Sequence, residues 1–387
     1  MRRLSLLFSL LATTSFAEVP RVATDIAPVH SLVAAIMDGA GAPDLIIAPG
    51  ASPHGYAMRP SEARNLAEAD LVIWVGPGLT PWLADPLESL AGDAVHFTLM
   101  DVEGTRVLPV REGVGFEDHH NDHGDHGDHD DHGDHDDHGD HDDHGDHDDH
   151  ADHDDHGDHD DHGDHDDHSD HDDHGDHDDH GDHDDHGDHD GHGDHDDHSD
   201  HDDHDNHDDH DDHHAGGVDP HAWLDPLNGA AWAGAISKQL AEIDPENAAL
   251  YQQNALSLIQ DILAHEAKAQ ETFAPLQNRP FVVLHDAFQY VEARYELNAV
   301  ASVHDSEAAS PGAARVAQLR ERVKSEGVVC AFAEPQLNQG LLITVTEGLP
   351  VKIGTLDPLG ADLPLGPSHY MDTLEQLAQD MRDCLAK

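Results

Sequence analysis

A histidine stands at every third position from His123 to His213, in a stretch that reads mostly Gly-Asp-His-Asp-Asp-His. The segment around it, 117–214, holds 34 of the chain's 42 histidines, 47 acidic residues, no Lys or Arg, and one apolar side chain, Ala151. Such a segment cannot bury enough apolar surface to offset the entropy lost when a chain is ordered. A period of three also fits neither a helix nor a strand. We therefore expect segment 117–214, called the insert below, to be disordered and to add nothing to a hydrophobic core.

The insert concentrates imidazole nitrogens and carboxylate oxygens, the donor atoms that bind divalent transition metals such as zinc. An acidic spacer that only keeps the protein in solution is the simpler interpretation, but a spacer has no use for histidine. The composition therefore indicates metal binding by the insert, and it leaves the function of the folded part open.

The rest of the chain is moderately acidic. Of the formal charge of −65, the insert carries −47 and the remaining residues carry −18. An acidic body disfavours nucleic acids and anionic membrane surfaces as partners. Without the insert about 290 residues remain, which is enough for two domains of ordinary size.

The first residues have the pattern of an export signal. Arg2 and Arg3 precede an apolar run, Leu4–Leu11, and Ser15-Phe16-Ala17 forms a small-x-small cleavage site. This pattern predicts a signal peptide over residues 1–17. The apolar run is too short to span a bilayer, and no other apolar run approaches about 20 residues. We expect an exported protein without direct membrane insertion, in the periplasm rather than fully secreted.

The chain has two cysteines, Cys330 and Cys384. In an oxidising compartment an even pair most simply forms a disulfide. On the chain-entropy model, closing a loop of roughly 55 residues would stabilise the fold by about 4 kcal/mol. Two buried thiols are the alternative.

Short apolar runs alternate with helical stretches on both sides of the insert, a pattern typical of parallel sheets covered by helices. The predicted strands are 21–26, 45–48, 71–75 and 95–99 before the insert, and 281–285, 299–303, 328–333 and 351–356 after it. The predicted helices are 30–37, 61–69, 81–90, 226–243, 286–295, 311–326, 337–348 and 368–386, the last and the 311–326 helix with Ser368 and Ser310 as N-caps.

One further helix is unusually long. It begins with Asp244 as N-cap and Pro245 at the first helical position, and it runs to about Phe273 without an internal Gly or Pro. The fold class is therefore α/β, with two (β/α) domains that contain parallel sheets and are joined by one long rigid helix. The predicted boundaries are 18–243 for the N-terminal domain including the insert, 244–274 for the helix, and 275–387 for the C-terminal domain.

Eight histidines lie outside the insert, and three of them occupy equivalent places. His54 and His285 each follow a predicted strand, and His221 precedes a predicted helix where the chain leaves the insert. Ligands of open α/β sheets bind at the carboxyl ends of the strands. A single histidine there would more simply cap or pack, but three in a chain with a metal-binding insert favour a metal site. We do not expect His30 to be a ligand.

Five sequence runs of the chain resemble a known family. The runs ASPHGYAMRPSEARNLAEADLVIWVGPGL, DPHAWLDP, LHDAFQY, CAFAEPQ and GTLDPLGADLPLG, in this order, are similar to the zinc-specific substrate-binding proteins of bacterial ABC uptake transporters. The similarity covers the mature chain except the insert. It implies two (β/α) domains joined by a long rigid helix, with Zn(2+) held in the interdomain cleft by His54, His221 and His285. It also implies a disulfide between Cys330 and Cys384.

The resemblance bears on metal selectivity through position 285. Manganese-binding relatives carry a carboxylate there, so a histidine moves the site toward nitrogen ligands and favours zinc. Some zinc-binding relatives place a glutamate just before the first histidine, where this chain has Pro53. Asp357 matches a carboxylate ligand of the manganese relatives, and as a ligand or a nearby anion it would balance the buried dication. A water as fourth ligand, and a turn role for Asp357 before proline, remain open.

Other residues suggest weaker hypotheses. Glu334 ends a predicted strand, where it could orient a ligand or cap a helix. The four tryptophans are expected in the core: Trp74, Trp82, Trp223 and Trp232.

These observations predict a monomeric, non-enzymatic protein that captures Zn(2+) in the periplasm and delivers it to the membrane permease of an ABC transporter. The insert would act as an auxiliary zinc collector. A zinc-dependent hydrolase could use the same three histidines, but no glutamate stands in an HExxH-like spacing as general base. A surface adhesin and a simple metal buffer are further alternatives, and nothing in the sequence specifies a macromolecular partner for an adhesin.

Overall fold

The computed structural model describes the folded part of the chain, which comprises residues 19–111, 113, 116, 217–304 and 312–386. The predicted signal peptide, the insert and Ser310 lie outside these residues. The statements that follow concern the described part alone.

A four-stranded parallel sheet forms the N-terminal half, with strand order β2-β1-β3-β4. Its strands are β1 (Val22–Thr24), β2 (Asp44–Leu45), β3 (Leu71–Trp74) and β4 (Val95–Thr98), and its helices are α1 (Ala27–Ile36), α2 (Pro60–Ala67) and α3 (Ala84–Leu90). The central strand β3 reads Leu-Val-Ile-Trp and is buried along its whole length. A strand covered by helices on both faces needs such a continuous apolar run.

The C-terminal half repeats this arrangement with the order β6-β5-β7-β8, again all parallel. Its strands are β5 (Phe281–Val283), β6 (Ala299–Ser302), β7 (Cys330–Ala333) and β8 (Lys352–Thr355), and its helices are α6 (Gln289–Tyr295), α7 (Ala313–Ser325), α8 (Gly340–Thr346) and α9 (His369–Leu385). The prediction of two parallel-sheet α/β units is therefore confirmed. The domain boundaries at residues 243 and 275 stay predictions.

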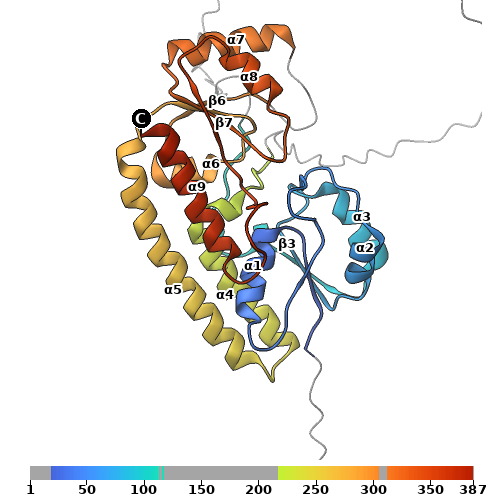
Figure 1. Cartoon of the computed structure of the whole chain (residues 1–387). Coiled ribbons are helices and arrows are strands. Elements are labelled where there is room, and N and C mark those ends of the chain that lie inside the picture. Colours follow the sequence, from blue (N-terminus) through green and yellow to red (C-terminus); the bar gives the residue numbers. More distant parts are fainter. Residues whose placement is uncertain (1–18, 112, 114–115, 117–216, 305–311, 387) are drawn as a thin grey trace, which may run out of the picture. The chain divides into compact units, whose positions relative to one another are not determined.

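Two long helices connect the halves of the chain: α4 (Pro226–Ile243) and α5 (Ala248–Phe273). Asp225 caps α4, because its side chain accepts a hydrogen bond from the amide of Leu227 at 3.0 Å. With 26 residues, α5 extends for about 39 Å. Figure 1 shows it running from the helices around the first sheet to the second sheet.

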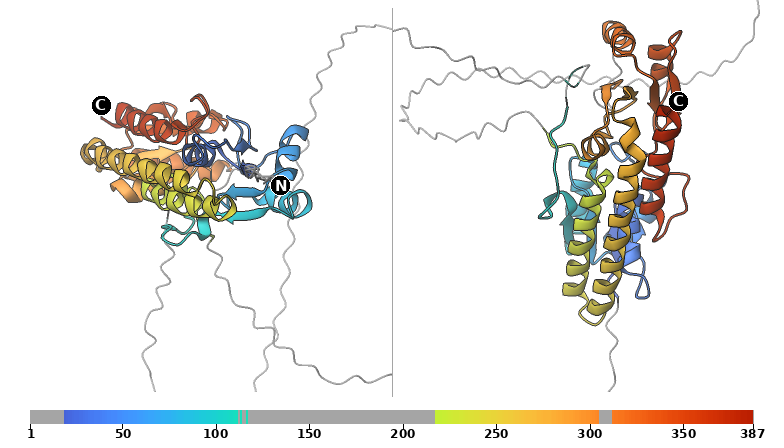
Figure 2. Two further views of the ribbon diagram at one scale, coloured as in Figure 1. Left: turned by 90° about the horizontal axis from the view of Figure 1, so that it is seen from below. Right: turned by 90° about the vertical axis from the view of Figure 1, so that its left-hand side faces the viewer.

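The C-terminal helix α9 returns to the N-terminal half, which the sequence did not indicate. It packs against α1 and α5, and Figure 2 shows it beside α5. The amide of Tyr370 donates to Ser31 Oγ at 2.9 Å, and the Tyr370 hydroxyl donates to the carbonyl of Trp223 at 2.8 Å. A Cβ on Gly229 of α4 would lie 2.3 Å from that hydroxyl, so glycine allows this close approach. Two helices, α5 and α9, therefore tie the halves together.

The predicted start of the long helix was wrong by three residues. Asp244 is the C-cap of α4, and α5 begins at Ala248 with Asn247 as N-cap. The Asp244 carboxylate accepts hydrogen bonds from the Asn247 amide at 3.3 Å and from the Tyr251 hydroxyl at 2.7 Å. Asp244 therefore caps a turn before the helix, and Pro245 lies within that turn.

Ser368 does occupy the predicted N-cap position of α9, but it does not cap the backbone with its side chain. Its hydroxyl donates to the carboxylate of Asp372 at 2.8 Å.

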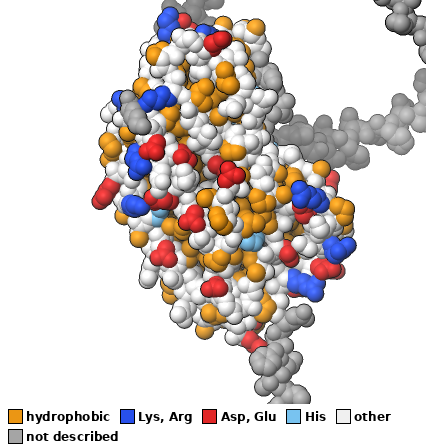
Figure 3. All heavy atoms as spheres, viewed as in Figure 1, with side chains coloured by type: hydrophobic (Ala, Val, Ile, Leu, Met, Phe, Trp, Pro, Cys, Tyr) orange, Lys and Arg blue, Asp and Glu red, His pale blue; other side chains and the backbone are white. Residues whose placement is uncertain are grey.

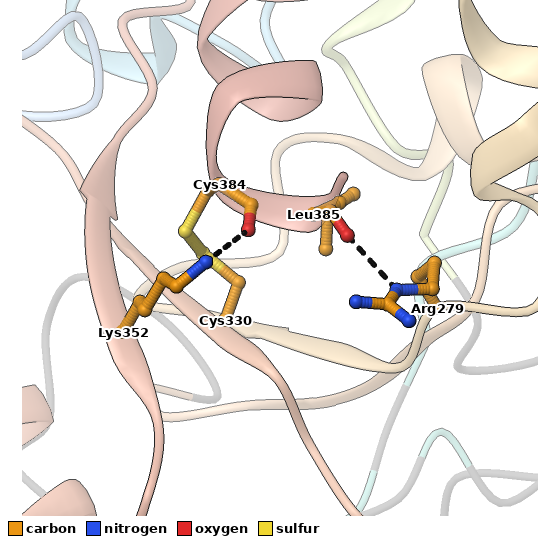
Figure 4. Close-up of a disulfide and its surroundings, with 5 residues drawn as sticks. All are labelled: Arg279, Cys330, Lys352, Cys384 and Leu385. Atoms are coloured by element: carbon orange, nitrogen blue, oxygen red, sulfur yellow. Dashed lines mark hydrogen bonds between the residues drawn. A yellow bond between two sulfur atoms is a disulfide. The ribbon is translucent and has the colours of Figure 1, made fainter. Parts of the chain in front are cut away.

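The predicted disulfide between Cys330 and Cys384 is present and joins the start of β7 to the end of α9 (Figure 4). Two side chains hold the same helix end. Lys352 Nζ donates to the carbonyl of Cys384 at 3.5 Å, and Arg279 Nε donates to the carbonyl of Leu385 at 2.9 Å. The last turn of α9 is thus fixed to the second sheet by one covalent bond and two polar contacts.

Of the two apolar cores among the described residues, the larger reaches through both halves, and the smaller lies in the C-terminal half between its sheet, α7 and α8. The larger core includes the inner faces of both sheets and the buried faces of α1, α4, α5 and α9. Within the described residues no helix is both long enough and apolar enough to cross a membrane. On the face shown in Figure 3, acidic and basic side chains alternate with apolar ones.

Candidate metal centre

His54 lies in the bend between β2 and α2, and its side chain is half-buried. The bend is held by its neighbours, because Trp82 Nε1 donates to the carbonyl of Pro53 at 2.8 Å and the His54 amide donates to Ser52 Oγ at 3.3 Å. The ring of Tyr56 lies 5.8 Å from that of Trp82. We expected Trp82 in the core. It is only partly buried, and its hydrogen bond to the carbonyl of Pro53 holds the bend that carries His54.

His221 lies just before a short 3₁₀ helix (Ala222–Leu224) and is buried. Its Nδ1 lies 2.7 Å from Asp219 Oδ1, which also accepts the His221 amide at 3.0 Å. A carboxylate at Nδ1 fixes the proton there and leaves the lone pair of Nε2 free to bind a metal. Burial, followed by the neighbouring His285, holds the pKa of His221 well below its usual value of 6.5, so the imidazole is neutral.

His285 lies in the bend between β5 and α6, since the strand ends at Val283 and the helix begins only at Gln289. The predicted strand and helix were each too long here. Its Nδ1 lies 3.3 Å from Glu334 Oε2, and Glu334 follows the neighbouring strand β7. Both residues thus stand at the carboxyl ends of adjacent parallel strands, where the strand order of the sheet reverses and ligands bind.

The three imidazoles converge on one point. Each offers one ring nitrogen, and these atoms all lie within 4.8 Å of one another. The Nε2 atoms of His54 and His221 are 3.2 Å apart. Two nitrogens bound to one tetrahedral zinc at about 2.05 Å would lie about 3.3 Å apart. The donor set and its spacing therefore fit a zinc ion.

A small cavity of about 10 Å³ lies at this point, with room for about one water molecule. Besides the three histidines it is lined by Pro53, Trp223, Glu334, Gln336, Pro358 and Leu359. The ring of Trp223 lies 5.4 Å from that of His221, and its Nε1 donates to the carbonyl of Pro358 at 2.8 Å. Trp223 is buried, as expected, and it also forms a wall of the site.

Asp357 does not belong to this three-histidine group among the described residues. Its Oδ1 accepts hydrogen bonds from Gln336 Nε2 at 2.8 Å and from the Leu359 amide at 3.0 Å. Its Oδ2 accepts from the Ala361 amide at 2.6 Å. Both oxygens are thus engaged in a turn, and Gln336 links this carboxylate to the cavity wall.

Among the described residues His30 also lies outside the group. Burial lowers the pKa of its imidazole.

Sequence reasoning missed Asp219, Gln336 and Arg111 around the site. Asp219 stands two residues before His221 in the run DPHAWLDP, so its position in that run was the one available signal. Arg111 Nε donates to Asp286 Oδ2 at 2.9 Å, next to His285 in the chain. A lone arginine before an acidic insert has no pattern that marks it.

Comparisons with known proteins identify the family of the chain. The sequence profile described as zinc-uptake complex component A, periplasmic (ZnuA), matches residues 22–384. The high-affinity zinc uptake system protein ZnuA of Brucella suis is 37% identical over 366 residues, which cover 95% of this chain and 92% of that protein. The protein of the same name from Paracoccus denitrificans is 38% identical over 370 residues, 95% and 93% of the two chains.

Among solved structures, the crystal structure of a ZnuA superposes with a TM-score of 0.63 at 16% identity and covers 95% of this chain and 100% of its own. At that identity the likeness shows the fold alone. The profile match over nearly the whole chain and the two curated relatives carry the assignment. The chain belongs to the family of periplasmic zinc-uptake component A proteins.

Proposed function

We propose that this protein binds Zn(2+) in the periplasm and delivers it to the membrane permease of an ABC transporter. The observation that carries the proposal is the convergence of three imidazole nitrogens within 4.8 Å of one another. The printed name of the Brucella suis relative, a high-affinity zinc uptake protein, supports the same cargo. These relatives favour zinc uptake over the hydrolase and adhesin alternatives.

The ligands in this proposal are His54, His221 and His285. Imidazole nitrogen suits zinc better than it suits manganese, which prefers oxygen. A water completes the tetrahedron in the small cavity. Asp357 then acts as an anion behind Gln336 rather than as a ligand, because both of its oxygens already accept hydrogen bonds.

Two buried carboxylates supply the charge that three neutral ligands lack. Asp219 and Glu334 each contact the Nδ1 of one histidine, at 2.7 Å and 3.3 Å. When zinc polarises the imidazoles, these carboxylates accept stronger hydrogen bonds and stabilise the bound dication. A neutral set of ligands thereby holds a doubly charged ion without an isolated buried charge.

The insert serves this site as an auxiliary collector. Its 34 histidines raise the zinc concentration close to the folded body, and each site there binds zinc more weakly than the three-histidine site does. The protein acts as a monomeric binding protein rather than an enzyme.

Growth under zinc limitation tests this function. A strain whose own copy carries His54→Ala, His221→Ala and His285→Ala together should fail to grow in zinc-depleted medium and recover when zinc is added. A strain with His96→Ala serves as control, since that histidine lies outside the three-histidine group. Growth of the triple variant at the wild-type rate would refute the proposal.

A further inference from the structure

Arg111 lies where the chain enters the insert, and its guanidinium forms hydrogen-bonded ion pairs with two carboxylates of the C-terminal half. Nε donates to Asp286 Oδ2 at 2.9 Å, and Nη2 donates to Asp286 Oδ1. Nη1 and Nη2 donate to the two oxygens of Glu292 at 2.7 Å and 3.0 Å. The guanidinium also stacks on the ring of Phe116, with Cζ 3.7 Å from the ring centroid.

This cluster is largely removed from water. The side chains of Arg111, Asp286 and Glu292 are 16%, 14% and 7% exposed. Arginine can engage both oxygens of two carboxylates at once because its donors form a rigid planar fork, whereas lysine offers a single point charge. The contact therefore fixes positions and angles as well as balancing charge.

Asp286 directly follows His285 in a bend that belongs to neither β5 nor α6. The backbone holds this bend through the amide of Leu284, which donates to the carbonyl of Phe332, and the amide of Ala287, which donates to the carbonyl of His285, both at 2.9 Å. Side-chain contacts add to these two hydrogen bonds. The hydrogen bonds from Arg111 to Asp286 hold the bend. Glu334 holds the His285 ring, with its Oε2 3.3 Å from Nδ1 of the imidazole.

The segment that carries Arg111 is paired with the segment that leads to the second histidine. The amide of Val110 donates to the carbonyl of Gly217 at 2.8 Å, and the amide of Asp219 donates to the carbonyl of Leu108 at 2.9 Å. The hydroxyl of Tyr290, on α6, accepts from the Leu108 amide at 3.1 Å and donates to the Asp219 carbonyl at 2.8 Å. The two chain segments that flank the insert are thus joined to each other and to α6.

These contacts form a continuous series between two proposed ligands, His285 and His221. The series runs from His285 through Asp286 and Arg111 to the paired segments 108–110 and 217–219, and from there through Asp219 to the imidazole of His221. Arg111 is the one side chain in it that joins the segment before the insert to the bend of His285.

We propose that Arg111 is a positioning residue of the metal site. It holds His285 in the position relative to His221 that metal binding requires, and it thereby sets how slowly the bound metal leaves. The inference rests on the proposed zinc site. It assigns a role to a residue that touches no ligand nitrogen and acts through Asp286.

A pair of substitutions separates positioning from charge. Arg111→Lys keeps the positive charge and loses the fork, and Arg111→Gln loses both. If Arg111 positions His285, both variants release zinc faster, by about tenfold or more, as is usual when a group that orients a ligand is lost. If Arg111 acted by charge alone, Arg111→Lys would match wild type, and Arg111→Gln would release zinc more slowly because two carboxylates near the dication lose their counter-charge.

The control is Arg294→Lys. Arg294 lies on the same helix α6, and its Nε and Nη2 donate to the two oxygens of Asp225 at 2.9 Å and 2.6 Å, with a side chain 19% exposed. The substitution is thus the same and the burial is similar, but the partner caps α4 and is not bonded to a proposed ligand. This variant should lose thermal stability and keep the wild-type release rate.

The measurement uses the full chain loaded with Zn(2+) and mixed with an excess of a chromogenic chelator in a stopped-flow instrument. Tryptophan emission is followed in parallel, and because the insert has no Trp, Tyr or Phe, this signal originates in the folded body. Faster release by Arg111→Lys, with Arg294→Lys unchanged, supports the proposal. Release by Arg111→Lys at the wild-type rate overturns it.

Two further results keep the test decisive. If the Arg111 variants do not fold, Asp286→Asn removes one partner of the fork and should also speed release, so an unchanged rate in that variant overturns the inference. If wild-type protein holds no slowly released zinc, the proposed function fails rather than the role of Arg111.

Discussion

At the scale of single residues, the proposed site consists of three imidazoles, two of which contact carboxylates through Nδ1. Position 285 decides the chemical character of the donor set. His285→Glu replaces nitrogen with oxygen and adds a charge, so zinc should bind more weakly and manganese more strongly than in wild type. Competition between the two metals for the full chain measures this, and an unchanged preference would remove His285 from the site.

The carboxylate at Asp219 should contribute to affinity without touching the metal. Asp219→Asn keeps an oxygen that accepts the Nδ1 proton of His221 and removes the charge. We expect zinc affinity to fall by about 10-fold to 100-fold, the usual range for such partners of a ligand. Chelator competition measures it. Asp244→Asn is the matched control, because that carboxylate is bound to Tyr251 at 2.7 Å at the start of α5 and should leave affinity unchanged.

At the scale of secondary-structure elements, the sheets place the ligands and the long helices fix the sheets. Cys330 begins β7, the strand whose far end leads to Glu334, and Cys384 lies in the last turn of α9. Replacing both cysteines with alanine should lower the free energy of unfolding by about 4 kcal/mol, since the bond closes a loop with a sequence separation of 54 residues. Urea unfolding measures the change, and a loss below about 1 kcal/mol would show that the packing of α9 suffices.

Most of these elements could be predicted from the sequence because apolar runs and helical spacing are local signals. The strands around Leu71–Trp74 and Phe281–Val283 and the helix Pro226–Ile243 lie where the pattern placed them. The start of α5 could not be predicted, because Asp244-Pro245 suits a turn as well as it suits the start of a helix. The hydrogen bond from the Tyr251 hydroxyl, in the first turn of α5, to Asp244 selects the turn.

The candidate site was predicted only in part. His54 and His285 were predicted from their positions after strands and His221 from its position before a helix, together with the resemblance to a family. Asp219 and Arg111 act through contacts with residues distant in sequence, such as Asp286 and Glu292, and only the folded structure brings these together.

At the scale of the whole molecule, the protein combines one proposed site in the folded body with a histidine-rich insert, and pH should separate the two. Histidine binds metal only when neutral, and an unperturbed pKa lies near 6.5, so zinc binding by the insert should fade as pH falls through that value. Burial holds the pKa of His221 well below 6.5, so zinc binding at the folded site should persist to lower pH than zinc binding by the insert.

Replacing the 34 histidines of the insert by serine, with every aspartate kept, should therefore slow zinc-limited growth at pH 7.5 and have little effect below about pH 6. Growth rate and the rate of zinc transfer to the folded site measure this across pH 6 to 8. Equal performance by the serine variant at every pH would leave the insert with no collecting role.

The central claim, one tight zinc held by His54, His221 and His285, is tested most directly by counting retained metal. The full chain is loaded with zinc and dialysed against a chelator strong enough to strip the insert, and the remaining zinc is measured per chain. We predict one retained zinc in wild-type protein and in the serine variant of the insert, and none after His54→Ala, His221→Ala and His285→Ala together. Retention of one tight zinc by the triple variant would contradict the account.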